Sequence, residues 1–134
     1  MKKILTFILN HCMFLFEKYG FRFVDSLYSK SFGGDAYVTI ESENMKMRFT
    51  LDRGQLLLEF ASRKRQKSKW YSIDLISQLV TGKVETTALL DDHYAQFLVE
   101  SIEEILNLFS EKNLERTLQE LSKLAKERAK RLFG

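Results

Sequence analysis

Few residues of this chain have side chains that commonly act as nucleophiles, general bases or metal ligands. The 134 residues include two histidines, His11 and His93, and one cysteine, Cys12. Cys12 directly follows His11, but neighbouring residues of a helix point about 100° apart, which does not align a thiol with an imidazole. The sequence therefore predicts a buried apolar cysteine at this position and no nucleophile–base pair.

The densest group of ionisable residues is DDHY, residues 91–94. Asp91, Asp92 and His93 could together bind a metal ion or share a proton. Aspartates that directly precede an apolar periodic segment also cap helix N-termini, and this is the favoured interpretation. Because thiols and imidazoles are so few and no catalytic signature sequence occurs, we expect no catalytic residues, no metal site and no cofactor.

A second carboxylate group follows in the same predicted helix. Residues 85–115 carry eight acidic residues and a single lysine. A solvated helix flank explains such residues, and an acidic docking surface for a basic partner protein is the functional alternative. The residues expected to make that contact are Asp91, Asp92, Glu100, Glu103 and Glu104.

A basic segment at residues 63–71 ends in two aromatic residues. Its cations precede Trp70 and Tyr71, and they are Arg63, Lys64, Arg65, Lys67 and Lys69. Cations next to an aromatic ring can bind a phosphate backbone and stack a base, which makes nucleic-acid binding through this loop an alternative function. The net charge of only +3 and the acidic block at 85–115 argue against it. The two oppositely charged blocks could also meet within one chain or between copies, so a homo-oligomer stays open.

The chain opens with MKKILTFILNHCMFLF, two lysines followed by an apolar run. A secretory signal needs a small-residue cleavage site, and this run is followed by Glu17 and Lys18 instead. A transmembrane helix needs about 20 apolar residues, more than this run contains. Apolar spacing of three and four residues predicts a core helix that ends at Gly20. Its expected inner positions are Ile4, Leu5, Ile8, Leu9, Cys12, Leu15, Phe16 and Tyr19.

The elements that follow predict an α+β domain. Alternating apolar residues predict strands at 21–32, 36–41, 45–51 and 55–61, with a turn at Gly33 and Gly34 and a short fifth strand at 69–71. Helical spacing and capping residues predict helices at 72–81, 91–109 and 110–132, the last two packed as an antiparallel hairpin. The expected fold is an N-terminal helix, a four- to five-stranded antiparallel meander and three C-terminal helices packed on one sheet face, in a single globular domain of residues 1–134.

These observations favour a non-enzymatic protein-binding module. A small α+β domain with a single cysteine, opposed charged surfaces and no catalytic constellation is similar in profile to many bacterial immunity and antitoxin-type proteins, which cover a partner's site. That likeness implies an acidic helix as the inhibitory surface. The single cysteine gives no sign of an oxidising compartment, so we expect a cytoplasmic location and no membrane partner. A third possibility is an enzyme or ligand carrier with a pocket between sheet and helices that uses Tyr37, His93 or Trp70.

Overall fold

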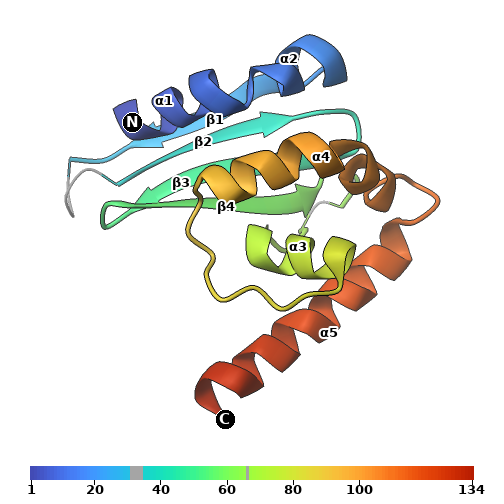
Figure 1. Cartoon of the computed structure of the whole chain (residues 1–134). Helices are drawn as coiled ribbons and strands as arrows, with labels where there is room; N and C mark the ends of the chain where they lie inside the picture. The colour runs from blue at the N-terminus through green and yellow to red at the C-terminus, as the bar shows by residue number, and fades with distance from the viewer. Residues whose placement is uncertain (31–34, 66) are drawn as a thin grey trace.

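The computed structural model describes residues 1–30, 35–65 and 67–134. Five helices and five strands form an α+β domain (Figure 1). Along the chain they are α1 Lys2–His11, α2 Met13–Tyr19, β1 Arg22–Tyr28, β2 Ala36–Glu41, β3 Met45–Asp52, β4 Gln55–Ser62, β5 Tyr71–Ser72, α3 Ile73–Thr81, α4 Asp92–Leu108 and α5 Leu114–Phe133. The turn expected at Gly33 and Gly34 lies outside the described residues.

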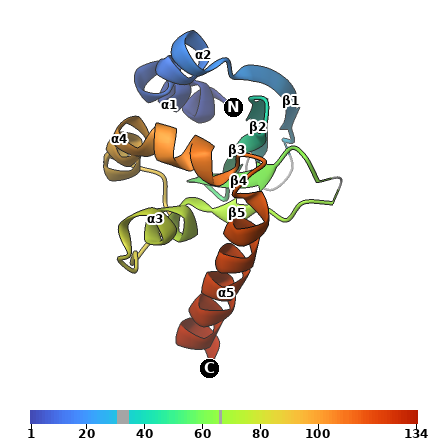
Figure 2. The same cartoon turned by 90° about the vertical axis from the view of Figure 1, so that its right-hand side faces the viewer.

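The five strands form one antiparallel sheet in the order β1-β2-β3-β4-β5, so each strand lies beside its neighbour in the sequence. Short turns explain this meander, since Asp52 pairs directly with Gln55 across the turn at Arg53 and Gly54. Gly54 has a φ of 79°, in the left-handed region that favours glycine. The helices α1, α2, α3 and α4 lie to one side of the sheet, and its other face is open (Figure 2). β1 and β5 form the two edges of the sheet.

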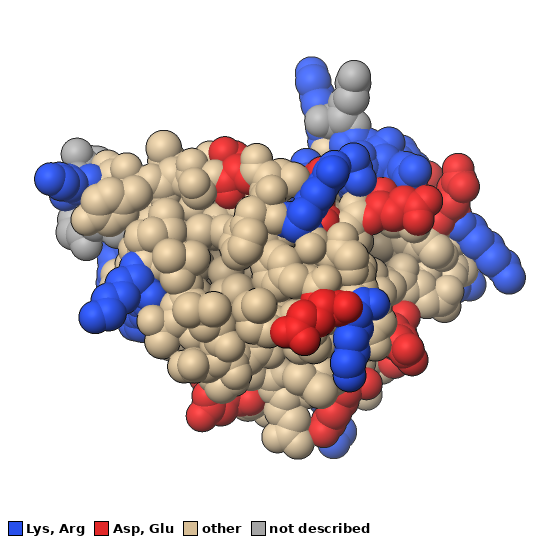
Figure 3. Space-filling model, turned by 90° about the horizontal axis from the view of Figure 1, so that it is seen from above, with Lys and Arg blue, Asp and Glu red and all other residues tan. Residues whose placement is uncertain are grey.

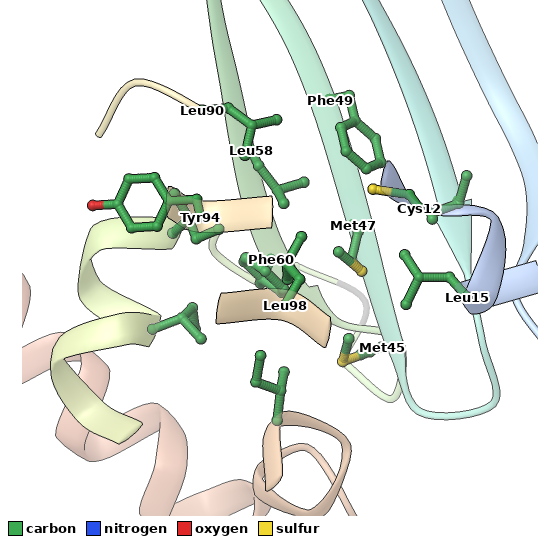
Figure 4. Packing of buried hydrophobic residues seen from close by; sticks show 14 of the residues in the cluster. Cys12, Leu15, Met45, Met47, Phe49, Leu58, Phe60, Leu90, Tyr94 and Leu98 are labelled. Atoms are coloured by element: carbon green, nitrogen blue, oxygen red, sulfur yellow. The ribbon is translucent and has the colours of Figure 1, made fainter. Parts of the chain in front are cut away.

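The alternation of residues in the strands decides which face is covered. In β3, Met45, Met47 and Phe49 are fully buried against the helices, as their period of two predicts. β2 and β4 contribute the same face of the core through Val38, Ile40, Leu56, Leu58 and Phe60. Figure 4 shows the strand residues Met45, Met47, Phe49, Leu58 and Phe60 together with Cys12 and Leu15 from the N-terminal segment and Tyr94 and Leu98 from α4.

The N-terminal segment forms two helices rather than one. It breaks at Cys12, whose φ of −121° leaves the helical range, and it ends at Gly20 in the left-handed conformation as predicted. Ile4, Ile8, Cys12 and Leu15 are buried as expected. The prediction was wrong for Leu5 and Leu9, which point to solvent. The apolar face is wider than the sheet beneath it, and Phe7 is buried in their place.

The C-terminal helices agree with the prediction except for the start of the last helix and the helix on which it packs. Asp91 caps α4, and its inner residues, such as Phe97 and Ile102, are buried. α5 begins at Leu114 rather than Ser110, because residues 110–113 form a turn in which Asn113 donates its backbone N–H to Ser110 O at 3.0 Å. α5 then packs on α3 and runs past the β5 edge, instead of lying along α4 as a hairpin (Figures 1 and 2).

Within the described part of the chain, no helix is both long and apolar enough to cross a bilayer.

Candidate functional site: two exposed surfaces on opposite sides of the sheet

The acidic residues predicted as a docking surface lie on and before α4. All five are exposed. Asp91 accepts a hydrogen bond from Tyr94 N at 3.1 Å and so caps the helix, as the favoured interpretation of DDHY predicted. Asp92 and Glu103 are separated by about 16 Å along the helix, given a rise of about 1.5 Å per residue. The carboxylates therefore form two groups rather than one cluster.

Neighbouring side chains already contact several of these carboxylates. His11 Nε2 lies 3.5 Å from Asp92 Oδ1, and the hydroxyl of Tyr19 donates to Glu103 at 3.5 Å. Gln96 donates to Glu100 at 2.9 Å along the same helix. Because exposed contacts of this kind are weak, the outer side of α4 stays available as an acidic surface.

His93, the other predicted site residue of DDHY, lines a groove between α1 and the start of α4. The groove has a volume of about 900 Å³, and Lys2, Lys3, Asn10, His11, Asp91, Asp92 and His93 are among its lining residues. His93 Nε2 is 3.5 Å from Glu85 Oε2. Glu85 also accepts hydrogen bonds from Ser77 at 3.0 Å and Tyr94 at 3.4 Å, so it ties the segment before α4 to α3 and α4. The partner of His93 thus has a structural role.

The groove does not assemble a catalytic set. Cys12 is buried, and burial raises the pKa of its thiol to about 12, so the thiol stays protonated at neutral pH. Among the described residues, no three His, Cys, Asp or Glu side chains are placed to hold a metal ion. Tyr37 and Trp70 contact Arg48 on the open face, on the other side of the sheet from α1 and α4. These three candidate pocket residues therefore do not share a pocket between sheet and helices.

An exposed apolar surface on α1 and β1 was not predicted as a site. Its members are large hydrophobic side chains of α1, of β1 and of the first residue of α2, here called the α1–β1 apolar surface: Leu5, Leu9, Met13, Phe23 and Val24. Leu9 is 66% exposed and Phe23 is 56% exposed. Seen from above, this side of the molecule has a broad area without Lys, Arg, Asp or Glu side chains (Figure 3). A groove of about 620 Å³ between Leu5 and β1 is lined by Phe23 and Val24.

The edge strand β1 extends this surface. All seven of its residues are exposed, and it pairs with β2 on one side only among the described strands. The pairing is interrupted at Val24, which the ladder skips between Phe23 and Asp25. An edge strand leaves backbone N–H and C=O groups unpaired along its free side, and such edges readily pair with another strand. The irregular alternation of residues 21–28 is the signal that could have marked an edge strand.

The open face of the sheet carries a second cluster, centred on Arg48 of β3. Its guanidinium carbon lies 4.3 Å from the ring centre of Tyr37 on β2 and 4.4 Å from that of Trp70, which precedes β5. Arg48 Nε donates to Thr39 Oγ1 at 2.9 Å, and Lys46 Nζ lies 5.2 Å from the Trp70 ring centre. The predicted site residue Trp70 is therefore on the sheet face and surrounded by cations, not packed in the core.

The basic loop, residues 63–65 and 67–69, lies at the open face of the sheet. All five of its predicted cations are exposed. Arg63 donates to Ser42 O at 3.1 Å and lies 3.5 Å from Glu41, which places the start of the loop beside the β2–β3 turn. Arg65 forms an ion pair with Glu115 at the start of α5, so the basic and acidic blocks of the sequence do meet within the chain. The loop projects from the sheet on the side away from α3 and α4 (Figure 2).

Comparison with known proteins adds no name to either surface: no family model, curated protein or solved structure matches this chain.

Proposed function

We propose that this protein is a non-enzymatic protein-binding module whose contact surface is the α1–β1 apolar surface, flanked by the acidic outer side of α4. The observation that carries the proposal is the exposure of five large hydrophobic side chains on adjoining elements. Contiguous apolar patches on a protein surface mark interaction sites, because water around them is released when a partner covers them.

The negative charge of α4, next to the α1–β1 apolar surface, indicates which kind of partner would fit. The exposed side of α4 adds Glu100, Glu103 and Glu104, and α1 and α4 are close enough for His11 to contact Asp92. Stable interfaces combine an apolar centre with a polar, solvent-accessible rim. The matching partner is therefore a protein with an apolar contact centre and lysines or arginines at one side of it. The more specific form of this proposal is a cytoplasmic, bacterial inhibitor of the immunity or antitoxin type.

The free edge of β1 supports the same location. A partner that supplies an extended segment could pair with β1 through the main chain and fill the groove beside Leu5 and Phe23. Main-chain hydrogen bonds to β1 would provide affinity whatever the side chains of the partner's segment, whereas the groove would select apolar side chains. A free strand edge beside an apolar groove fits a protein partner and does not fit a small polar substrate.

The test uses two leucines with the same exposure. Leu9 on α1 and Leu132 near the end of α5 are each 66% exposed. The tagged wild-type protein and the variants Leu9→Glu and Leu132→Glu are used to capture proteins from the host lysate at moderate salt, and light scattering gives the mass of each purified bait. We expect a discrete partner that the wild type and Leu132→Glu retain and Leu9→Glu loses.

Two results would contradict the proposal. One is a partner retained equally by all three baits, which would place the contact elsewhere. The other is no complex at any salt concentration together with an identical monomer mass for all three. If the wild type and Leu132→Glu are dimers and Leu9→Glu is a monomer, the α1–β1 apolar surface binds a second copy, and the partner protein is this chain itself.

A further inference from the structure

We infer that the open sheet face around Trp70 binds single-stranded nucleic acid, with phosphates on the basic loop and a base stacked against Trp70. This inference is independent of the proposed protein contact, since it uses the other face of the sheet. The sequence alone indicated only the basic loop and Trp70. The structure adds residues of β3 and α5 that lie beside the Trp70 ring.

The first step is the concentration of positive charge at one aromatic ring. Lys46 and Arg48 contact the Trp70 ring at 5.2 and 4.4 Å, and Lys69 precedes it in the chain. Two cations lie over the ring and Lys69 lines the groove beside it, so the accessible part of the indole can hold a planar base while these cations contact the neighbouring phosphates. Trp70 is half-buried, so part of the indole is accessible.

The second step is a groove between Trp70 and α5. It has a volume of about 300 Å³, and the residues that line it are Lys69, Trp70, Tyr71, Leu75, Ser122, Ala125, Lys126, Arg128 and Ala129. None of these lining residues is acidic. On the α5 side of the groove, Ser122, Ala125 and Ala129 have small side chains that leave room for a ligand. Lys126 on α5 and Lys69 next to Trp70 supply positive charge from the two sides of the groove. The groove therefore suits a flat, negatively charged ligand.

The third step concerns the carboxylates of the open face, which would otherwise repel phosphate. Glu41 lies 3.0 Å from Arg22 and 3.5 Å from Arg63, and Asp25 accepts a hydrogen bond from Tyr37 at 3.1 Å. Both are thus engaged by neighbours, and Glu59 on the same face lies beside Arg48, whose positive charge offsets it. In contrast, Lys64, Lys67 and Lys69 have no ion-pair partner in the described part of the chain, so their charge is available to a ligand.

The aromatic ring is the reason to infer a single strand. In a duplex the base faces are stacked on one another and inaccessible, whereas single-stranded bases can stack on exposed aromatic side chains. An acidic peptide would use the cations but gain nothing from stacking on Trp70. A duplex and an acidic peptide are therefore the outcomes that the experiment must distinguish from a single strand.

The chain contains one tryptophan, so its fluorescence reports on the inferred site directly. A 15-nucleotide oligothymidylate is titrated into the full-length protein at 50 and 200 mM salt. We expect quenching of Trp70 fluorescence. Contact of three phosphates with Lys64, Lys67 and Lys69 predicts an affinity about 20-fold lower at the higher salt, from the salt dependence of single-strand binding.

Charge-reversed variants locate the contact. The triple variant Lys64→Glu, Lys67→Glu, Lys69→Glu is expected to lose binding at least 30-fold. The matched control reverses three other exposed lysines, Lys18, Lys83 and Lys112, and should retain most of it despite the same change in net charge. Trp70→Leu, followed with a fluorescently labelled oligonucleotide, should weaken binding about tenfold. Leu9→Glu should bind the oligonucleotide as the wild type does.

The inference is overturned by any of three results. Equal loss in both triple variants would mean that only net charge matters. Equal affinity for polyglutamate or for a duplex of the same length would mean that Trp70 stacks no base. The third result is binding that leaves the fluorescence unchanged and survives Trp70→Leu. Circular dichroism of each variant establishes that it is folded before it is compared.

Discussion

Helices α1 and α5 are attached to the rest of the fold in different ways. α1 is attached mainly by hydrocarbon packing, through Ile4, Phe7 and Ile8 against β3, and Lys3 adds a hydrogen bond to Gly54 O at 2.8 Å. α5 buries Leu114 and Leu121 in the core near its start, and further along it is held by polar groups, because Arg128 donates to Asp74 at 2.9 Å and to Ser72 at 2.7 Å. The later part of α5 therefore depends on a polar contact, whereas α1 depends mainly on apolar packing.

This contrast assigns different sensitivities to the two proposed contacts. Burial of the α1–β1 apolar surface changes little with salt, because its driving force is the release of water from apolar groups. Binding at the Trp70 side depends on cations and weakens as salt rises. The same distinction should hold for stability, so substitutions in the packing under α1 and in the polar contact of α5 should differ in size and in their dependence on salt.

The largest effect is expected for truncation of the packing under α1. Phe7 is buried and its ring lies 6.3 Å from that of Phe49. Phe7→Ala should lower the free energy of unfolding by about 3–4 kcal/mol in urea denaturation, because it leaves a cavity between α1 and β3. Leu9→Ala, at an exposed position of the same helix, should change it by less than about 0.5 kcal/mol. Equal effects of the two substitutions would show that α1 is not held by its buried face.

A smaller loss is expected at the attachment of α5. The side chain of Asp74 is 10% exposed and that of Arg128 is 32% exposed. Asp74→Ala removes the carboxylate and leaves the guanidinium with Ser72 alone, which should cost about 2 kcal/mol. The exposed Asp52→Ala serves as the control and should be nearly neutral. If high salt leaves the Asp74→Ala difference unchanged, the polar character of this attachment is not what stabilises it.

Alkaline pH should act on the N-terminal helices through Cys12. Burial raises the pKa of this thiol from 9.0 to about 12, so the folded protein keeps it neutral while the unfolded chain ionises. The stability due to the neutral thiol is therefore complete below pH 9 and is lost progressively between pH 9 and 12. At pH 10 the loss should be about 1.4 kcal/mol relative to pH 8. It should be absent in Cys12→Ala, and an equal loss in both proteins would assign it to other groups.

The smallest effect is expected on the open face, at Glu59. Burial raises the pKa of this carboxyl, and the nearby Arg48 opposes that increase. A raised pKa means that the folded state favours the protonated form, so stability is lost as pH rises through the folded pKa. Glu59→Gln should therefore stabilise the protein slightly at pH 7, by about 0.5 kcal/mol, and not at pH 3. A stabilisation of the same size at both pH values would contradict this assignment.

The sheet and its covered face could be predicted because their signals are local. Met45, Met47 and Phe49 alternate with polar residues, and a period of two leaves one assignment of faces. Gly20, Gly82 and Asp91 marked helix ends through backbone chemistry that operates within a few residues. The first residue of α5 was harder to predict, because Ser110 and Asn113 are both acceptable residues at a helix start.

The two surfaces were harder to predict because each depends on contacts between distant segments. Leu5 and Leu9 have the spacing of core residues, and only the width of the sheet beneath α1 decides that they are exposed. The stacking of Tyr37, Arg48 and Trp70 depends on strand register, which pairs Thr39 with Arg48 across β2 and β3. The basic loop was recognisable from its sequence, but its position beside Arg48 was not.

The consecutive order of the strands has a consequence for the rate of folding. Each hairpin of the sheet joins segments that are adjacent in the chain, so most of the sheet forms through contacts of short sequence separation. Closing such short hairpin loops costs little chain entropy, so pairing within the sheet can begin early in folding. The chain has no proline, so no slow prolyl isomerisation interrupts this process. Refolding from urea should therefore follow a single rapid phase, with α1 docking onto β3 once the central hairpin has formed.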